Sequence, residues 1–275
     1  MRGEATAFVP GHITGFFSAH PDDDPTRAGS RGVGLTLTDG VEVTVRQGPD
    51  REIVLDGETI DVEPVETVLQ TLQATAIVEV DSALPLGAGF GVSGAMALGT
   101  ALAVNHAFER ELSMNELVTI AHGAEVQAGT GLGDVVAQAA GGVPIRLEPG
   151  GPQHNVLDAI PERARVEYRS SGSLSTADVL EGDTEALSEA GKSALSRVVA
   201  EPTLASFIYA SRRFAREAGL LTVNVKDAID DVSETGGHAS MALLGDTVFA
   251  LGTGLSDAGY EPEVCGIHPA GAMLS

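Results

Sequence analysis

Cysteine, tryptophan and lysine are scarce in this 275-residue sequence, and each scarcity narrows the classes of protein it can belong to. The single cysteine, Cys265, excludes an internal disulfide and a metal site with several thiolate ligands, and we expect it to be a small buried apolar residue. No apolar run approaches the roughly 18 residues that a membrane-spanning helix needs. The first residues contain the acid Glu4 and no apolar core, so we predict a cytoplasmic protein that binds no membrane.

Basic residues are equally few: 16 lysines and arginines stand against 39 acids, and the formal net charge is −23. Only Lys192 and Lys226 are lysines. A nucleic-acid-binding protein needs a basic face, so we predict no nucleic-acid partner. Surface acids with almost no lysine are typical of proteins in concentrated salt, where the Debye length is only about 3 Å at 1 M. We therefore predict a halophilic, archaeal source, although this charge says nothing about chemistry.

Glycine, by contrast, is abundant, with 34 residues that gather in clusters. The first cluster, Gly87–Gly94, lies between a predicted strand over 75–80 and a predicted helix over 95–108. Glycine lets the main chain approach a phosphate closely, and a helix N-terminus supplies free N–H groups and a favourable dipole. We predict that this segment, called the phosphate loop below, holds the phosphates of a nucleotide.

The phosphate loop has three other interpretations. Gly89, Gly91 and Gly94 match the dinucleotide fingerprint G-x-G-x-x-G, but the following helix leads into another helix from Ser113 and not into a second parallel strand that ends in an acid. No lysine follows the glycines, which excludes the Walker pattern. A tight strand-to-helix connection without a ligand stays open on local sequence alone.

A second glycine loop, residues 128–133, lies between two acids, Glu125 and Asp134. A kinase without a phosphate-loop lysine still needs a magnesium ligand and a group that accepts the proton of the substrate hydroxyl. Glu125 and Asp134 can meet these needs, and His122 shares the predicted helix face of Glu125. The alternative, a solvated acid at 125 and a packed core histidine at 122, stays open for either residue alone.

The N-terminal segments predict strands separated by turns. We predict a strand over 4–9 that ends at Pro10-Gly11, a long loop over 20–32 and a hairpin turn at Asp39-Gly40. Within the long loop, Asp22–Asp24 resembles a metal cluster, but three successive acids cannot all face one ion, so we predict a solvated loop.

The rest of the chain predicts helices mixed with strands. Ser113 with Glu116 predicts a capping box, and amphipathic helices are predicted over 184–199 and 203–218. Because strands and helices do not alternate strictly, we predict two α+β domains. The turn at Pro149–Pro152 predicts their boundary, with an N-terminal domain over 1–150 and a C-terminal domain over 151–275.

Three segments resemble, in order, the motifs of the GHMP kinases, the superfamily of galacto-, homoserine, mevalonate and phosphomevalonate kinases. They are Phe8–Phe17, Pro85–Ala95 and Glu234–Ala242, and they span nearly the whole chain. The resemblance implies a ribosomal S5 domain 2-like N-terminal domain, a ferredoxin-like C-terminal domain, and ATP with Mg2+ as the phosphoryl donor.

Within this superfamily the details resemble the archaeal pantoate kinases. The segments that carry this resemblance are Pro10–Phe17, Gly29–Gly34, Gly89–Gly94 and Ala128–Val135. The resemblance implies phosphorylation of pantoate by ATP to 4-phosphopantoate, on the archaeal route to coenzyme A.

The resemblance also implies roles for single residues. Ser93 and Glu125 would bind magnesium, and Asp134 would be the catalytic aspartate. The residues that would hold the nucleotide are Pro85, Gly87, Gly89, Gly91, Ser93, Gly94, Gly236 and Gly237. The chain departs from the family pattern in three places: His12 stands where the mevalonate kinases have a lysine, Val92 replaces the first motif serine, and Gly-Gly-His replaces Gly-Gly-Gly.

The carboxylate of pantoate needs a cation or several donors when it is buried. With two lysines in the chain, arginine is the expected source, and we favour Arg146 and Arg31 over Arg27. Ser30 accompanies Arg31, and His122 would orient a substrate hydroxyl. His12 completes the predicted substrate residues.

Other functions stay open. Another GHMP kinase, for homoserine or a mevalonate-type alcohol, is the nearest alternative. A nicotinamide-dependent oxidoreductase and a non-catalytic nucleotide-binding regulator are more distant ones. The oligomeric state is also open, with a homodimer among the alternatives.

Overall fold

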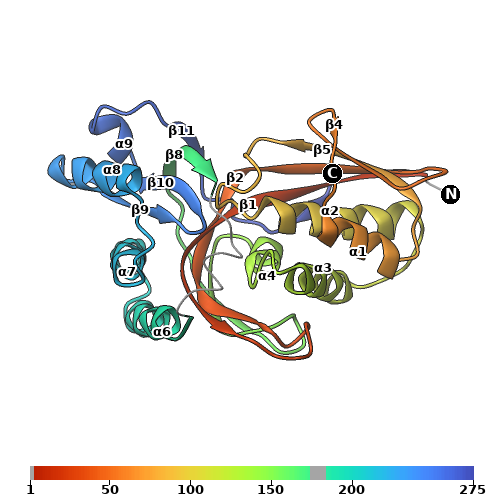
Figure 1. The fold of residues 1–275 in the computed structure, drawn as a ribbon, viewed down its shortest axis with the longest axis horizontal. Helices are drawn as coiled ribbons and strands as arrows, with labels where there is room; N and C mark the ends of the chain where they lie inside the picture. The colour runs from red at the N-terminus through yellow and green to blue at the C-terminus, as the bar shows by residue number, and fades with distance from the viewer. Residues whose placement is uncertain (1–2, 174–183) are drawn as a thin grey trace.

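The computed structural model describes residues 3–173 and 184–275, which form two sheets and two groups of helices (Figure 1). The first sheet is built on a long antiparallel pair, β1 (Glu4–His20) and β2 (Gly29–Gln47). Its strand order is β12-β1-β2-β5-β3-β4, and β6 pairs with β2 and with β7. The remaining strands of this sheet are β3 (Glu52–Leu55), β4 (Glu58–Thr59), β5 (Ala76–Ser82), β6 (Val143–Glu148), β7 (Val156–Ile160) and β12 (Met273–Leu274).

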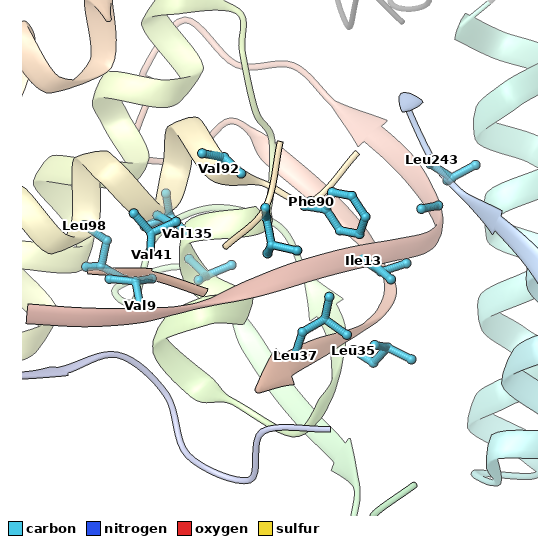
Figure 2. Packing of buried hydrophobic residues seen from close by; sticks show 14 of the residues in the cluster. Val9, Ile13, Leu35, Leu37, Val41, Phe90, Val92, Leu98, Val135 and Leu243 are labelled. Carbon is cyan, nitrogen blue, oxygen red and sulfur yellow. The ribbon is translucent and has the colours of Figure 1, made fainter. Parts of the chain in front are cut away.

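Four helices belong to this half: α1 (Glu63–Thr71), α2 (Val92–Ala107), α3 (Met114–Ala128) and α4 (Asp134–Ala140). Helices α2 and α4 contact the sheet, and α1 and α3 pack over α2. The central helix α2 is buried on nearly all sides because it lies between the sheet and the helices α1 and α3. Small residues permit this position: a Cβ at Gly99 would come within 2.5 Å of the Val43 side chain on β2. The close packing holds the N-terminus of α2, and with it the phosphate loop, over β1 (Figure 2).

The second sheet is antiparallel, with the order β11-β8-β10-β9. Its strands are β8 (Arg165–Ser173), β9 (His238–Ala242), β10 (Gly245–Leu251) and β11 (Glu263–Gly266). The helices of this half are α6 (Thr184–Ala200), α7 (Leu204–Glu217), α8 (Val223–Glu234) and α9 (Gly254–Asp257). The prediction of a mixed α+β fold is confirmed.

Two of these helices dock against β1 through glycines. Gly191 of α6 lies against the main chain at Phe17, where a Cβ would overlap with the carbonyl. A Cβ at Gly15 of β1 would come within 2.5 Å of the ring of Phe207 on α7. The two halves of the chain therefore share one apolar core, in which Phe16 lies 6.4 Å from both Phe207 and Phe214 between ring centroids.

The predicted N-terminal turns are wrong. The strand β1 continues through Pro10-Gly11, and β2 continues through Asp39-Gly40, because the two segments lie opposite one another in a single long pair. Gly40 is needed for close approach and not for a turn, since a Cβ there would lie 2.7 Å from the ring of Phe8. The predicted loop over 20–32 shrinks to 21–28, because residues 29–32 pair with 17–20.

Most helix predictions agree with the structure. The capping box of Ser113 and Glu116 is confirmed, and α6 and α7 cover the predicted helices. Helix α2 begins at residue 92, three residues before the predicted start. Cys265 is only partly buried, and Asp22–Asp24 is exposed as predicted.

The predicted boundary near residue 150 stays a prediction, although β7 and β12, which follow it in sequence, pair within the first sheet. Among the described helices, none combines the length and apolarity that crossing a membrane requires.

Candidate active site

A cleft of about 440 Å³ lies where the phosphate loop, the second glycine loop, the start of α1 and the β9–β10 turn meet. Thr14, Phe17, Ser30 and Arg146 add side chains from the first sheet. The cleft brings together segments from residue 14 to residue 244, so it is a product of the tertiary fold and not of one motif.

The phosphate loop lines this cleft with most of its residues. Gly87, Gly89 and Gly91 have φ angles of +77°, +87° and +63°, which side chains with a Cβ rarely adopt. Gly91 is the N-cap of α2, and the first turn of this 16-residue helix contains no acid. A helix N-terminus with free N–H groups and a positive dipole end is suited to an anion.

Three hydrogen bonds fix the loop from three sides. The His12 N–H of β1 donates to the carbonyl of Phe90 at 2.9 Å. The Thr247 hydroxyl of β10 donates to the carbonyl of Ala88 at 2.8 Å, and the Gln138 amide of α4 donates to the carbonyl of Gly91 at 2.9 Å. Because its carbonyls are held in this way, the loop is organised before any ligand binds.

Glu125 of α3 is 2% exposed, and its Oε1 has no hydrogen-bond partner. Burial raises the pKa of Glu125 to about 7, the negative charge of Asp134 adds to this, and hydrogen bonds from Ser93 and Thr130 oppose it. A buried, unpaired carboxylate oxygen beside a phosphate-binding loop fits a hard divalent cation such as Mg2+.

The protein alone offers few ligands for such an ion. Among residues 3–173 and 184–275, no group of three or more His, Cys, Asp or Glu residues could hold a metal. Mg2+ is commonly bound by one or two protein groups together with substrate phosphates and water, and the pair of Ser93 and Glu125 is consistent with that mode.

Asp134 is the first residue of α4, and its side chain is 23% exposed toward the cleft. Its Oδ1 lies 2.7 Å from Nδ1 of the fully buried His12. Burial acts to raise the pKa of Asp134, but the hydrogen bond from His12 and the positive charge of Arg146 oppose this, and the pKa falls below its usual value. Asp134 is therefore an ionised carboxylate at neutral pH.

Arg146 of β6 is 1% exposed, and its Nε and Nη1 have no hydrogen-bond partner. Ser30 lies close to it: a Cβ at Gly133 would come 2.5 Å from the Ser30 Oγ and 2.6 Å from the Arg146 Nε. Burial lowers the pKa of Arg146, and the negative charge of Asp134 opposes this. Unpaired guanidinium donors at a cleft are suited to a carboxylate, which accepts two parallel hydrogen bonds.

Several predicted site residues lie outside the cleft lining. His122 is buried, and its Nε2 lies 2.9 Å from the carbonyl oxygen of Ala28. Arg31 pairs with Glu148 at 2.5 Å and does not line the cleft. His12 is fully buried, contacts Asp134 and does not line the cleft.

Only some of the residues predicted to hold the nucleotide line the cleft. Gly87, Gly89, Gly91 and Ser93 line the cleft, whereas Pro85, Gly94, Gly236 and Gly237 do not. Gly94 packs against the side chains of α4. Gly237 packs against Val232 and Gly254, within the second half.

The β9–β10 turn contacts the phosphate loop, whereas Gly236 and Gly237 do not line the cleft. A Cβ at Gly89 would lie 2.9 Å from the carbonyl oxygen of Leu243 and 3.1 Å from the Gly245 nitrogen. Leu244 has a φ of +67°, which is rare for a residue with a branched side chain. The sequence did not predict that this turn lines the cleft, because two leucines do not indicate a ligand site.

The place of the α1 start in the cleft was also not predicted from the sequence. Asp61, Val62, Glu63 and Pro64 line the cleft beside Leu86. Pro64 in the first turn of α1 marks a helix start, but nothing local to it indicates a ligand. Phe17 and Thr14 were quoted only as part of a motif, and their place in the cleft depends on the register of β1.

Comparisons with known proteins agree with this architecture. The family model of the GHMP kinases N terminal domain matches residues 63–142. The chain is similar to the pantoate kinase of Methanospirillum hungatei, with 34% identity over 90% of this chain and 87% of the relative. It is 35% identical to the pantoate kinase of Thermococcus kodakarensis, over 89% of this chain and 86% of that protein.

A solved structure described as a phosphotransferase related to the CoA biosynthesis pathway superposes with a TM-score of 0.88. It is 31% identical to this chain, and the match covers 99% of this chain and 98% of the other. On the fold, the cleft and these relatives, the chain belongs to the pantoate kinase family of the GHMP kinases.

Proposed function

We propose that this chain transfers the γ-phosphoryl group of ATP to the 4-hydroxyl of pantoate and forms 4-phosphopantoate on the route to coenzyme A. The observation that carries the proposal is the pair of Asp134 and Arg146: an ionised carboxylate and a buried guanidinium with free donors line the same cleft as the phosphate loop. Pantoate has a hydroxyl and a carboxylate that match these two groups. The relatives named pantoate kinases support the same substrate.

At the nucleotide end, Gly87, Gly89 and Gly91 would hold the phosphates of ATP through main-chain N–H groups. The apolar residues Val62 and Leu86 offer a surface for the base. Ser93 and Glu125 would hold Mg2+, which supplies neutralisation of the charge on the phosphate oxygens during transfer.

At the acceptor end, Asp134 would accept the hydrogen of the 4-hydroxyl. Phosphoryl transfer usually passes through a loose transition state, so the hydroxyl needs orientation more than early deprotonation. A carboxylate of lowered pKa suits this role because it stays ionised and accepts a hydrogen bond. Arg146 and Ser30 would bind the substrate carboxylate and so direct the hydroxyl toward Asp134.

Arg31 and His122 would act from outside the cleft. Arg31 holds Glu148, and His122 holds the segment before β2 through its contact with Ala28. Their role would be to keep the strand that carries Ser30 in place. Loss of pantoate affinity on changing either residue would then arise through Ser30 and not through direct contact.

The proposal also concerns salt adaptation, cellular location and oligomeric state. The net charge of −23 supports an enzyme that works in the salt-rich cytoplasm of a halophilic archaeon. Retention of full activity and a cooperative fold in low-salt buffer would contradict the halophilic part. A homodimer stays open, and light scattering at several salt concentrations decides between one and two chains.

The test is a substrate panel with the purified full chain, ATP and Mg2+ in high salt. We expect turnover with pantoate and a phosphomonoester on C4 in the 31P NMR spectrum of the product. Mevalonate and homoserine should give little ADP. Robust turnover on homoserine with none on pantoate would overturn the assignment, and tight NADH binding without ATP binding would favour an oxidoreductase.

A further inference from the structure

His12 is a buried histidine that contacts the two functional parts of the cleft at once. It lies on β1 at a register shift between residues 10 and 12, where the pairing with β2 is interrupted. Its main-chain N–H donates to the carbonyl of Phe90 in the phosphate loop at 2.9 Å. Nδ1 of its side chain lies 2.7 Å from Oδ1 of Asp134, and the two residues are 122 positions apart in the sequence.

The partners of the ring decide its tautomer. Asp134 is ionised and can only accept a hydrogen bond, so Nδ1 of His12 must carry the proton and donate it. The other nitrogen, Nε2, is buried without a partner and lies against Gly34, where a Cβ would overlap with the ring. Burial lowers the pKa of His12, Asp134 opposes this and Arg146 adds to it, so the ring is neutral.

The two carboxylate oxygens of Asp134 have different surroundings. Oδ1 faces His12 and the main chain at Gly91. Oδ2 lies on the other side, where a Cβ at Gly131 would be 3.4 Å from it and would overlap with Oε2 of Glu125. Oδ2 is therefore the oxygen on the side of the second glycine loop and of the candidate metal ligand.

We propose that His12 is a positioning residue, whose Nδ1–H holds Asp134 through Oδ1 so that Oδ2 is the atom that accepts the hydrogen of the acceptor hydroxyl. The proposal rests on the proposed function for the identity of that hydroxyl. It also assigns the register shift in β1 a purpose, because one residue sets the distance between the phosphate loop and the orienting carboxylate.

A neutral donor suits this position better than a cation. Arg146 already places a buried positive charge near Asp134, and its charge disfavours a second one at His12. A lysine at this position would need to bury its ammonium group near that guanidinium. An imidazole keeps the carboxylate in place with a single N–H and adds no charge.

The first test needs no turnover. Nitrogen-15 NMR of labelled wild-type protein should show one histidine, assigned by its loss in His12→Asn, that is neutral at pH 7 with the proton on Nδ1. Its Nδ1–H signal should shift upfield in Asp134→Asn. A charged ring at pH 7, or a proton on Nε2, would overturn the inference whatever the substrate proves to be.

The second test uses kinetics. His12→Leu removes the donor, and we expect kcat to fall about a hundredfold with the KM for ATP nearly unchanged, because misplacement of one group by about 1 Å has an effect of this size. His12→Asn places an amide N–H near the same point and should recover most of kcat. His268→Asn, which changes a partly buried histidine of the C-terminal segment, is the matched control.

A double-mutant cycle separates positioning from a structural role. In the Asp134→Asn background, His12→Leu should reduce kcat only slightly further, because the carboxylate that it positions is already gone. Equal losses in both backgrounds, or failure of His12→Asn to recover kcat while its thermal midpoint is normal, would overturn the proposal. Absence of pantoate turnover in wild type would instead refute the proposed function and leave the NMR result to decide this one.

Discussion

The two ends of the cleft are built from different parts of the chain. The phosphate end consists of main-chain N–H groups of glycines and of the α2 N-terminus, held by hydrogen bonds to carbonyls. The acceptor end consists of two ionisable side chains, Asp134 and Arg146. The first end binds with groups that every residue has, and the second depends on particular side chains.

This difference explains which departures from the family pattern are tolerated. Val92 replaces a motif serine at the phosphate end, and its N–H is still available at the start of α2. At the acceptor end the proposed binding groups are the side chains themselves, so a substitution there removes the group that would contact the substrate. Side-chain changes should therefore matter more at the acceptor end, and changes of main-chain conformation at the phosphate end.

The largest effect is expected for Asp134→Asn. The amide cannot accept the hydroxyl hydrogen as a carboxylate does, so kcat for pantoate should fall about a thousandfold, within the range usual for acid–base groups. Steady-state ADP release measures this. Asp158→Asn, at an exposed position of β7, is the matched control. Unchanged transfer in Asp134→Asn would show that the acceptor end does not depend on this side chain.

Next in size is Arg146→Lys. Lysine keeps the positive charge but loses the planar pair of donors, so the KM for pantoate should rise about a hundredfold while the KM for ATP changes little. Arg163→Lys, at an exposed arginine, should change neither value. An equal rise in both KM values would mean that Arg146 supports the whole cleft and not the acceptor end alone.

A smaller effect is expected for Gly89→Ala at the phosphate end, with Gly236→Ala as its matched control. Both glycines have positive φ angles, +87° and +80°, so both substitutions introduce about 1–2 kcal/mol of strain. Only at Gly89 would the Cβ meet neighbours, at 2.9 Å from Leu243, whereas nothing lies within 4 Å at Gly236. ATP affinity by calorimetry should fall about tenfold for Gly89→Ala alone. A similar loss of ATP affinity for Gly236→Ala would indicate that Gly236 and Gly237 contact the nucleotide.

The smallest effect is a pH dependence of stability from Glu125. Its pKa is raised from 4.5 to about 7, so the folded protein keeps a proton that the unfolded chain releases between these values. Stability is thus lowered progressively as the pH rises from 4.5 to 7, and the loss is constant above 7. In buffer without divalent ions, the thermal midpoint of Glu125→Gln should gain on wild type by a few degrees over this window. A difference that is independent of pH would contradict the raised pKa.

The sequence predicted those parts of the site that depend on local signals. The positions of the phosphate loop, the second glycine loop and α3 follow from glycines and a capping box, which act within a few residues. The continuous strands β1 and β2 could not be predicted in this way. Pro10-Gly11 and Asp39-Gly40 resemble turns locally, and only their pairing across the sheet makes them strand.

Contacts between segments that are distant in the sequence could not be predicted either. Arg146 and Arg31 were equal candidates for the substrate carboxylate, but they lie on neighbouring strands whose register places one in the cleft and the other on Glu148. The face of a strand that becomes buried is decided by the elements that pack on it. The β9–β10 turn and the start of α1 entered the cleft for the same reason.

The most direct test of the account is ADP release by the wild-type chain at saturating ATP, measured with and without pantoate in high-salt buffer. The account predicts strong release that requires pantoate and that disappears in Asp134→Asn. Release of the same rate without pantoate, or its persistence in Asp134→Asn, would contradict a cleft that joins a main-chain phosphate site to a side-chain acceptor site.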